Sequence, residues 1–112
     1  MAPDRRSSCP ISCTLDLIGD KWTLLVLRDM LFFQKGRFEE FLDSPEKIST
    51  NILTDRLHKL ENAGLVEKAP YSNHRLRMAY SPTDKGKSLK PILKQIVDWG
   101  LTNIENTGTM KK

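Results

Sequence analysis

Hydrophobic residues recur at helical spacing along most of the chain, and the pattern is clearest between residues 48 and 64. One side of a helix over this stretch carries leucines at i, i+4 and i+7, namely Leu53, Leu57 and Leu60. Ser49 or Thr50 can cap its start with a hydroxyl, and Gly64 can end it. Its other side is polar but weakly charged: Asn51, Thr54, Asp55, His58 and Asn62.

A polar side of this kind is typical of a helix that reads DNA. A helix that reads base edges needs short amides and hydroxyls, with an arginine or lysine at its margin for phosphates. For the major groove we expect Thr50, Asn51, Thr54, Asp55 and His58. For the backbone beside this helix we expect Ser49, Arg56 and Lys59.

The residues before this helix predict the rest of a helix-turn-helix. A short helix is expected at Thr14–Ile18 and a second at Lys21–Phe33, which is apolar nearly all round and therefore central and buried. Arg37–Leu42 predicts a third short helix, with Arg37 near the DNA backbone. Asp43–Lys47 contains a proline and predicts the tight turn before the recognition helix.

Two strands are expected after the recognition helix. Leu65–Tyr71 forms the first strand and Arg75–Ser81, with alternating apolar and polar residues, forms the second. Such a hairpin is a wing with a basic, polar tip, and a tip of this kind can lie along the DNA backbone or enter the minor groove. The backbone contacts expected on the wing are Asn73, His74, Arg75 and Arg77.

A last helix is predicted from Asp84 towards Ile104, capped by Thr83 and kinked or interrupted by Pro91. Its apolar stripe is wider than packing within one small domain requires, which favours a dimer surface. The alternative is that the stripe packs on its own domain. The expected dimer residues are Ile92, Ile96, Trp99, Gly100 and Ile104.

The predicted fold class is α+β, mainly α: a winged helix-turn-helix with a two-stranded wing and terminal dimerisation helices. The expected organisation is a flexible arm at 1–8, the winged-helix domain at 9–105 with its dimerisation helix at about 84–105, and a disordered tail at 106–112. A chain of 112 residues is long enough for one such domain.

We find no signal-peptide pattern and no apolar run as long as the roughly 20 residues of a membrane span, so we expect a cytoplasmic, nucleoid-associated protein with no membrane partner.

The charge is unevenly distributed. The net charge is +4, but residues 68–94 carry seven basic side chains against one acid. Such a concentration suits a phosphate-facing surface. Two functions fit it: a DNA-binding regulator, or a winged-helix interaction module that binds an acidic protein partner. The salt dependence of binding distinguishes them, because phosphate contacts release counterions.

Enzymatic function is not expected. The sequence contains no glycine-rich phosphate loop, no nucleophile elbow and no evident pair of catalytic carboxylates. A zinc site from Cys9, Cys13, His58 and His74 has the wrong spacing for a compact site. We therefore expect no metal and no cofactor.

The ordered motifs resemble those of the HxlR-type winged-helix transcription regulators, relatives of the MarR group. The resemblance runs from Cys9 to Gly100, and it rests on Cys9-Pro10, Gly19-Asp20-Lys21-Trp22-Thr23, Arg37-Phe38, Ile48-Ser49, Leu53-Thr54-Asp55-Arg56-Leu57, Leu60-Glu61, Gly64-Leu65-Val66, Tyr80-Ser81, Thr83, Gly86 and Asp98-Trp99-Gly100. It implies a homodimer joined by terminal helices that binds a pseudo-palindromic operator in double-stranded DNA. Pro82 stands where the family usually has leucine, and the tip Asn73-His74-Arg75 is not a shared pattern.

The resemblance also implies chemistry at the cysteines. In this family a cysteine at the position of Cys9 often senses oxidants or electrophiles, so a small-molecule or electrophile inducer is expected. Arg5, Arg6 or a helix N-terminus would favour its reactive thiolate, and Cys13 could resolve an oxidised sulfur. The alternative is that both thiols are small, half-buried hydrophobic groups in a reducing compartment.

Overall fold

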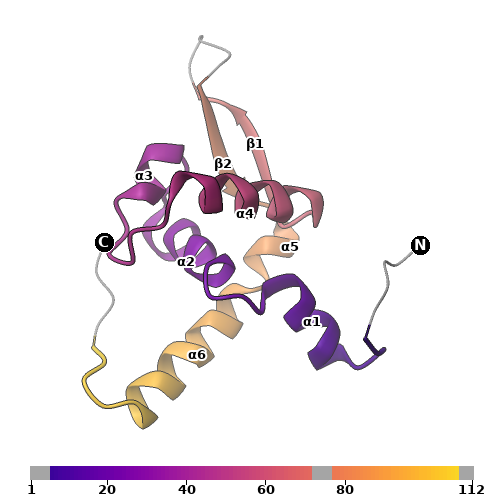
Figure 1. The fold of residues 1–112 in the computed structure, drawn as a ribbon, viewed down its shortest axis with the longest axis vertical. Helices are drawn as coiled ribbons and strands as arrows, with labels where there is room; N and C mark the ends of the chain where they lie inside the picture. The colour runs from indigo at the N-terminus through magenta and orange to yellow at the C-terminus, as the bar shows by residue number, and fades with distance from the viewer. Residues whose placement is uncertain (1–5, 72–76, 109–112) are drawn as a thin grey trace.

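The computed structural model describes residues 6–71 and 77–108, which form six helices and two strands. In chain order these are α1 (Pro10–Ile18), α2 (Thr23–Phe33), α3 (Phe38–Leu42), α4 (Thr50–Asn62), β1 (Val66–Pro70), β2 (Met78–Pro82), α5 (Asp84–Lys87) and α6 (Lys90–Asn103) (Figure 1). This confirms the predicted mainly helical fold with a two-stranded wing.

The core lies around α2, as its nearly continuous apolar sequence predicts. α2 contributes four buried apolar side chains: Val26, Leu27, Met30 and Leu31. The leucine side of α4 packs against this core, with Leu53, Leu57 and Leu60 buried. Phe41 of α3 and Leu93 of α6 complete it from two further directions. Apolar burial against one central helix therefore holds the DNA-binding elements together.

The first two helices begin at other residues than the pattern predicts. α1 starts at Pro10, four residues before the expected Thr14, because proline fits the first turn of a helix, where its missing N–H is not needed. α2 starts at Thr23, two residues after the expected Lys21. The Asp20 carboxylate accepts hydrogen bonds from the backbone N–H groups of Trp22 and Thr23, so the regular helix begins there.

The expected last helix is two helices. Thr83 caps α5 by accepting a hydrogen bond from the Gly86 N–H at 3.1 Å, as predicted. The break falls at Ser88 and Leu89, so that Pro91 lies in the first turn of α6 rather than inside a longer helix. Gly86 is needed for close packing, because a Cβ there would lie 2.0 Å from the Leu65 carbonyl oxygen.

The wing is an antiparallel pair in which Val66 lies opposite Pro82 and Pro70 opposite Met78. Arg37 adds a single bridge to Ala79, which joins the start of α3 to β2. The strands are shorter than predicted, since Leu65 precedes β1 and Arg77 precedes β2. The tip, residues 72–76, lies outside the described residues, as do residues 1–5 of the expected arm and 109–112 of the expected tail.

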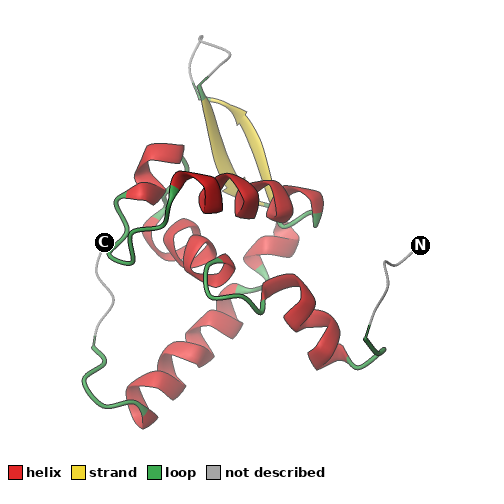
Figure 2. Cartoon of the chain, viewed as in Figure 1, coloured by secondary structure: helices red, strands yellow, loops and turns green. Residues whose placement is uncertain are grey.

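Figure 2 shows how these elements divide the molecule. The wing projects on one side, and α1 and α6 project on the other, with α2, α3 and α4 between them. Among the helices of residues 6–71 and 77–108, none is both long and apolar enough to cross a lipid bilayer.

Candidate nucleic-acid interface

The predicted recognition helix is α4, and its cap forms as expected. The Ser49 hydroxyl accepts a hydrogen bond from the Ile52 N–H at 3.2 Å, so Ser49 rather than Thr50 is the capping residue. At the other end Gly64 takes the left-handed conformation, with φ of 75°. The Thr83 hydroxyl and the Lys85 ammonium then bond to the Gly64 and Ala63 carbonyls, which fixes this end to α5.

The polar side of α4 is open to solvent. All five residues predicted for the major groove are exposed: Thr50, Asn51, Thr54, Asp55 and His58. The Thr54 hydroxyl donates to the Thr50 carbonyl at 2.8 Å, which leaves its oxygen free to accept a further hydrogen bond. Side chains of this chemistry, on a helix whose opposite side is fully buried, suit contact with base edges.

Arg56 differs from the expectation that it stands free at the margin of the helix. Its Nε donates to Asp20 at 3.0 Å, and one of its terminal nitrogens donates to Asp55 at 2.5 Å. The hydrogen bond that Arg56 donates to Asp20 outweighs burial and, together with the one to Asp55, raises the pKa of Arg56. Arg56 therefore ties α4 to the start of α2. Sequence spacing did not show this, because the partner is 36 residues away.

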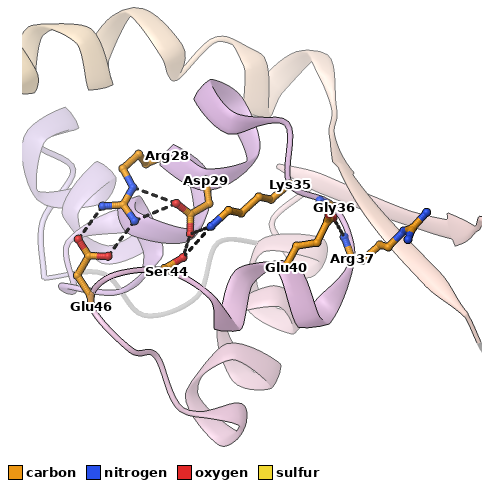
Figure 3. A network of polar contacts seen from close by, with 8 residues as sticks. All are labelled: Arg28, Asp29, Lys35, Gly36, Arg37, Glu40, Ser44 and Glu46. Carbon is orange, nitrogen blue, oxygen red and sulfur yellow. Dashed lines mark hydrogen bonds and ion pairs between the residues drawn. The ribbon is translucent and has the colours of Figure 1, made fainter. Parts of the chain in front are cut away.

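The turn before α4 is held by polar contacts to α2. Figure 3 shows Asp29 of α2 between Arg28, Lys35 and Ser44, with Glu46 bound to the outer side of Arg28. Next to this group, the Glu40 carboxylate accepts from the backbone N–H groups of Gly36 and Arg37 (Figure 3). These two hydrogen bonds lower the pKa of Glu40.

The wing brings some of the predicted backbone-binding residues together. The Arg37 guanidinium stacks over the Tyr71 ring, 4.4 Å from its centroid, so the exposed Arg37 lies near the end of the wing where β1 finishes and β2 starts. Arg77 is exposed beside β2, and Lys59 is exposed on α4. Asn73, His74 and Arg75 lie outside the described residues.

The basic quarter of the chain divides between different parts of the fold. Lys68 on β1 lies 3.9 Å from Glu61 of α4. Lys85 caps the end of α4, and Lys90 of α6 lies over the Phe32 ring. The basic residues of 68–94, which are close together in the sequence, are thus distributed over the wing, α5 and α6.

A second exposed surface is apolar and lies on α1 and α6. The predicted dimer residues Ile92, Ile96, Trp99 and Ile104 are exposed, with Trp99 at 63%, and Gly100 is half-buried. Sequence reasoning missed the contribution of α1, whose Ile11 and Leu15 are also exposed. Treating Pro10–Ile18 as one amphipathic helix would have revealed these exposed apolar residues of α1.

A groove of about 460 Å³ runs between α1 and α6, lined by Pro10, Ile11, Thr14, Leu15, Ile18, Gly19, Asp20, Leu24, Ile92 and Ile96. We call this whole surface the α1/α6 face.

Both cysteines are free thiols at the start of α1. Cys9 is exposed at the N-cap position, and Cys13 is half-buried one turn later. The Cys13 thiol donates to the Ser7 carbonyl at 3.4 Å. Arg6, one of the expected activating residues, pairs with Asp16 at 3.0 Å. Within residues 6–71 and 77–108, no three His, Cys, Asp or Glu side chains gather in a metal-binding arrangement.

A capped helix with an open polar side, a preceding tight turn and an adjacent wing define the class of helix-turn-helix transcription regulators. The chain belongs to the HxlR-like helix-turn-helix family, whose sequence model matches residues 17–108. It is similar to the helix-turn-helix-type transcriptional regulator YdeP of Bacillus subtilis strain 168, with 35% identity over 97 residues that cover 87% of this chain and 75% of YdeP. The family and its relatives are transcription regulators, not enzymes.

Solved structures agree with this assignment. The chain is similar to the transcription factor PA1607, with a TM-score of 0.81 and 34% identity over 96% of this chain and 75% of PA1607. It is also similar to the redox regulator HypR in its reduced form, with a TM-score of 0.75 and 35% identity over 87% of this chain and 95% of HypR.

Proposed function

We propose that the chain is a cytoplasmic, sequence-specific regulator that binds a pseudo-palindromic operator in double-stranded DNA as a homodimer. The observation that carries this proposal is the open polar side of α4, whose opposite leucine side is fixed in the core. A helix held in this way can enter a major groove without any change in its own packing.

In this proposal the residues divide into two roles. Thr50, Asn51, Thr54, Asp55 and His58 contact base edges and so select the sequence. Ser49, at the N-terminus of α4, and the exposed cations of the wing contact phosphates. The phosphate-binding set is completed by Arg37, Arg56, Lys59, Asn73, His74, Arg75 and Arg77. Of these, Arg56 donates to Asp20 and Asp55 through two of its nitrogens, which leaves other guanidinium N–H groups for a phosphate.

The α1/α6 face supports the homodimer. Exposed large apolar side chains on two neighbouring helices are costly in water, and a second copy can cover them with the same surface. Two-fold symmetry then presents two α4 helices to two half-sites, which is why a pseudo-palindromic operator is expected.

Cys9 is the proposed sensor of oxidants or electrophiles. It is an exposed free thiol at the N-cap of α1, where an oxidant in solution can reach it. HypR, to which the chain is similar, is described as a redox regulator. An oxidant such as diamide would remove two hydrogens from Cys9 and a second thiol, leaving a disulfide to Cys13 or to the other subunit.

The testing experiment is selection from random duplex DNA with reduced protein, with diamide-treated protein, and with Cys9→Ser in both states. We expect an enriched two-fold motif with half-sites about one helical turn apart. Oxidation should abolish enrichment for the wild type and leave it intact for Cys9→Ser.

Each other outcome overturns a stated part of the proposal. If no motif is enriched in any state, the chain is not a sequence-specific DNA binder, and an interaction module for an acidic protein partner takes its place. If Cys9→Ser responds to diamide like the wild type, Cys9 is not the sensor. A motif without two-fold symmetry would exclude the homodimer on DNA.

A further inference from the structure

A nearly buried group of charged and hydroxyl side chains joins α2 to the turn that precedes α4 (Figure 3). Asp29 is 2% exposed and Ser44 is 4% exposed, although both are polar. Buried polar groups are costly unless their hydrogen bonds are made. We call the set Arg28, Asp29, Lys35, Ser44 and Glu46 the turn clamp.

The Asp29 carboxylate is the centre of the turn clamp. Its Oδ1 accepts from Nε and a terminal nitrogen of Arg28 at 3.0 and 2.9 Å, and its Oδ2 accepts from the Ser44 hydroxyl. The Lys35 ammonium lies 3.8 Å from Oδ2 and donates to the Ser44 hydroxyl oxygen at 3.4 Å. The Asp29 side chain therefore links α2 to Ser44, near the start of the turn.

Arg28 extends the clamp to the far side of the turn. Its two terminal nitrogens donate to the two carboxylate oxygens of Glu46 at 2.7 and 2.8 Å. Two parallel hydrogen bonds fix the orientation of the Glu46 carboxylate relative to Arg28 as well as the distance between them. The bond from Arg28 also outweighs burial and holds the pKa of Glu46 below its ordinary value, so Glu46 stays ionised at neutral pH.

The clamp fixes the part of the backbone that decides where α4 begins. Lys47 bonds through its N–H to the Ser44 carbonyl at 3.0 Å and has φ of 60°, in the left-handed region that non-glycine residues rarely adopt. Ser49, which caps α4, follows two residues later. A shift of Ser44 or Glu46 would therefore move the first turn of α4, where Thr50 and Asn51 lie.

Apolar side chains of similar size would fill this space without the desolvation cost of two cations and two anions. Hydrogen-bonded charges, by contrast, fix the relative orientation of the groups that they join. We propose that Asp29, acting through Ser44 and through Arg28 and Glu46, is a positioning residue for sequence readout by α4. This inference rests on the proposed function, and it assigns a role in specificity to side chains that do not face the DNA-binding surface.

The test compares Ser44→Ala and Glu46→Gln with Ser12→Ala, a matched loss of a hydroxyl on α1. Affinity is measured for the selected operator and for random duplex at one salt concentration, together with melting temperature. For Ser44→Ala we expect the ratio of specific to non-specific affinity to fall about three- to tenfold, with non-specific affinity unchanged. Glu46→Gln should give a smaller fall in the same direction.

Amide hydrogen exchange provides a readout that needs no DNA. Ser44→Ala should speed exchange at Ile52 and Leu53, in the first turn of α4, and leave β1 unchanged. Global destabilisation would instead speed exchange in both places and lower both affinities together, which would overturn the positioning role. An unchanged affinity ratio with an unchanged first turn would overturn it as well. A wild-type protein with equal affinity for all duplexes would overturn the proposed function, while the exchange result would still decide whether the clamp positions α4.

Discussion

The polar side of α4 and the α1/α6 face are both exposed, but their chemistry is opposite. On α4, the exposed side chains are amides, hydroxyls, a carboxylate, an imidazole and an ammonium, which water hydrates well. On α1 and α6 they are isoleucine, leucine and tryptophan, including Ile11 at 71% exposure. Leaving the polar side uncovered costs little, whereas covering the apolar side gains free energy in proportion to its area.

This difference separates the two binding events. A partner for α4 has to supply matching donors, acceptors and charge, so its identity is restricted. A partner for the α1/α6 face has to supply apolar surface of complementary shape, and a second copy of the same chain does so. We therefore expect specificity to depend on α4 and assembly to depend on α1 and α6.

The two surfaces meet at Asp20. Asp20 lines the groove between α1 and α6, and its carboxylate also binds Arg56 of α4. Partial burial opposes its ionisation, but hydrogen bonds from Thr23 and Arg56 outweigh burial and hold the pKa of Asp20 well below its ordinary value. One hydrogen bond thus joins the lining of this groove to the recognition helix.

The largest expected effect is on assembly. Ile96→Glu places a charge at the centre of the proposed dimer surface, once in each subunit, and should weaken the dimer by about 100-fold or more. Sedimentation equilibrium measures the dimer affinity, and operator binding should fall with it. Gln95→Glu adds the same charge at an exposed polar position of α6 and should have little effect. Equal dimer affinity for the two variants would contradict the role of the α1/α6 face.

The next effect distinguishes the recognition helix from the wing. Asn51→Ala should cost about 1–3 kcal/mol against the preferred base and change the selected motif. Arg77→Ala should weaken binding to all sequences by a similar factor and reduce the slope of log affinity against log salt by about 0.9. Salt titrations of both variants on operator and random duplex provide the comparison. Identical behaviour of the two variants on all DNA would show that the roles are assigned wrongly.

The smallest effect is at the link between the surfaces. Asp20→Asn keeps a cap for α2 but loses the charge that binds Arg56, and it should lower the free energy of unfolding by about 1 kcal/mol near neutral pH. Because the folded-state pKa of Asp20 is lowered, its contribution is fully present above its ordinary value of 3.8 and is lost as the pH falls towards the folded-state value. Urea unfolding at pH 7 and below pH 4 measures this difference.

A control for that variant is Asp16→Asn, which removes an exposed partner of Arg6 on α1. It should change stability little at either pH, because exposed ion pairs are weak. A stability difference for Asp20→Asn that stays constant as the solution is acidified would show that the carboxylate charge has no part in it.

Local sequence patterns predicted most of the fold because each relevant signal is short in range. The spacing of Leu53, Leu57 and Leu60 predicted the buried side of α4, and Ser49 and Thr83 predicted two helix caps that the structure contains. The first helix begins at Pro10 rather than at the predicted Thr14, because a proline can begin a helix as well as stop one. The residues left out include Ile11, which is part of the apolar face.

The sequence by itself determined which segments are helices and strands and which side of each is apolar, because periodicity and capping act within a few residues. Only the tertiary structure decided which polar and charged groups are partners. Asp20 binds Arg56 and Asp29 binds Ser44 across 36 and 15 residues, and both pairs form because packing on α2 brings distant segments together. Hydrogen bonds of this kind depend on distances of a few ångströms that no local pattern encodes.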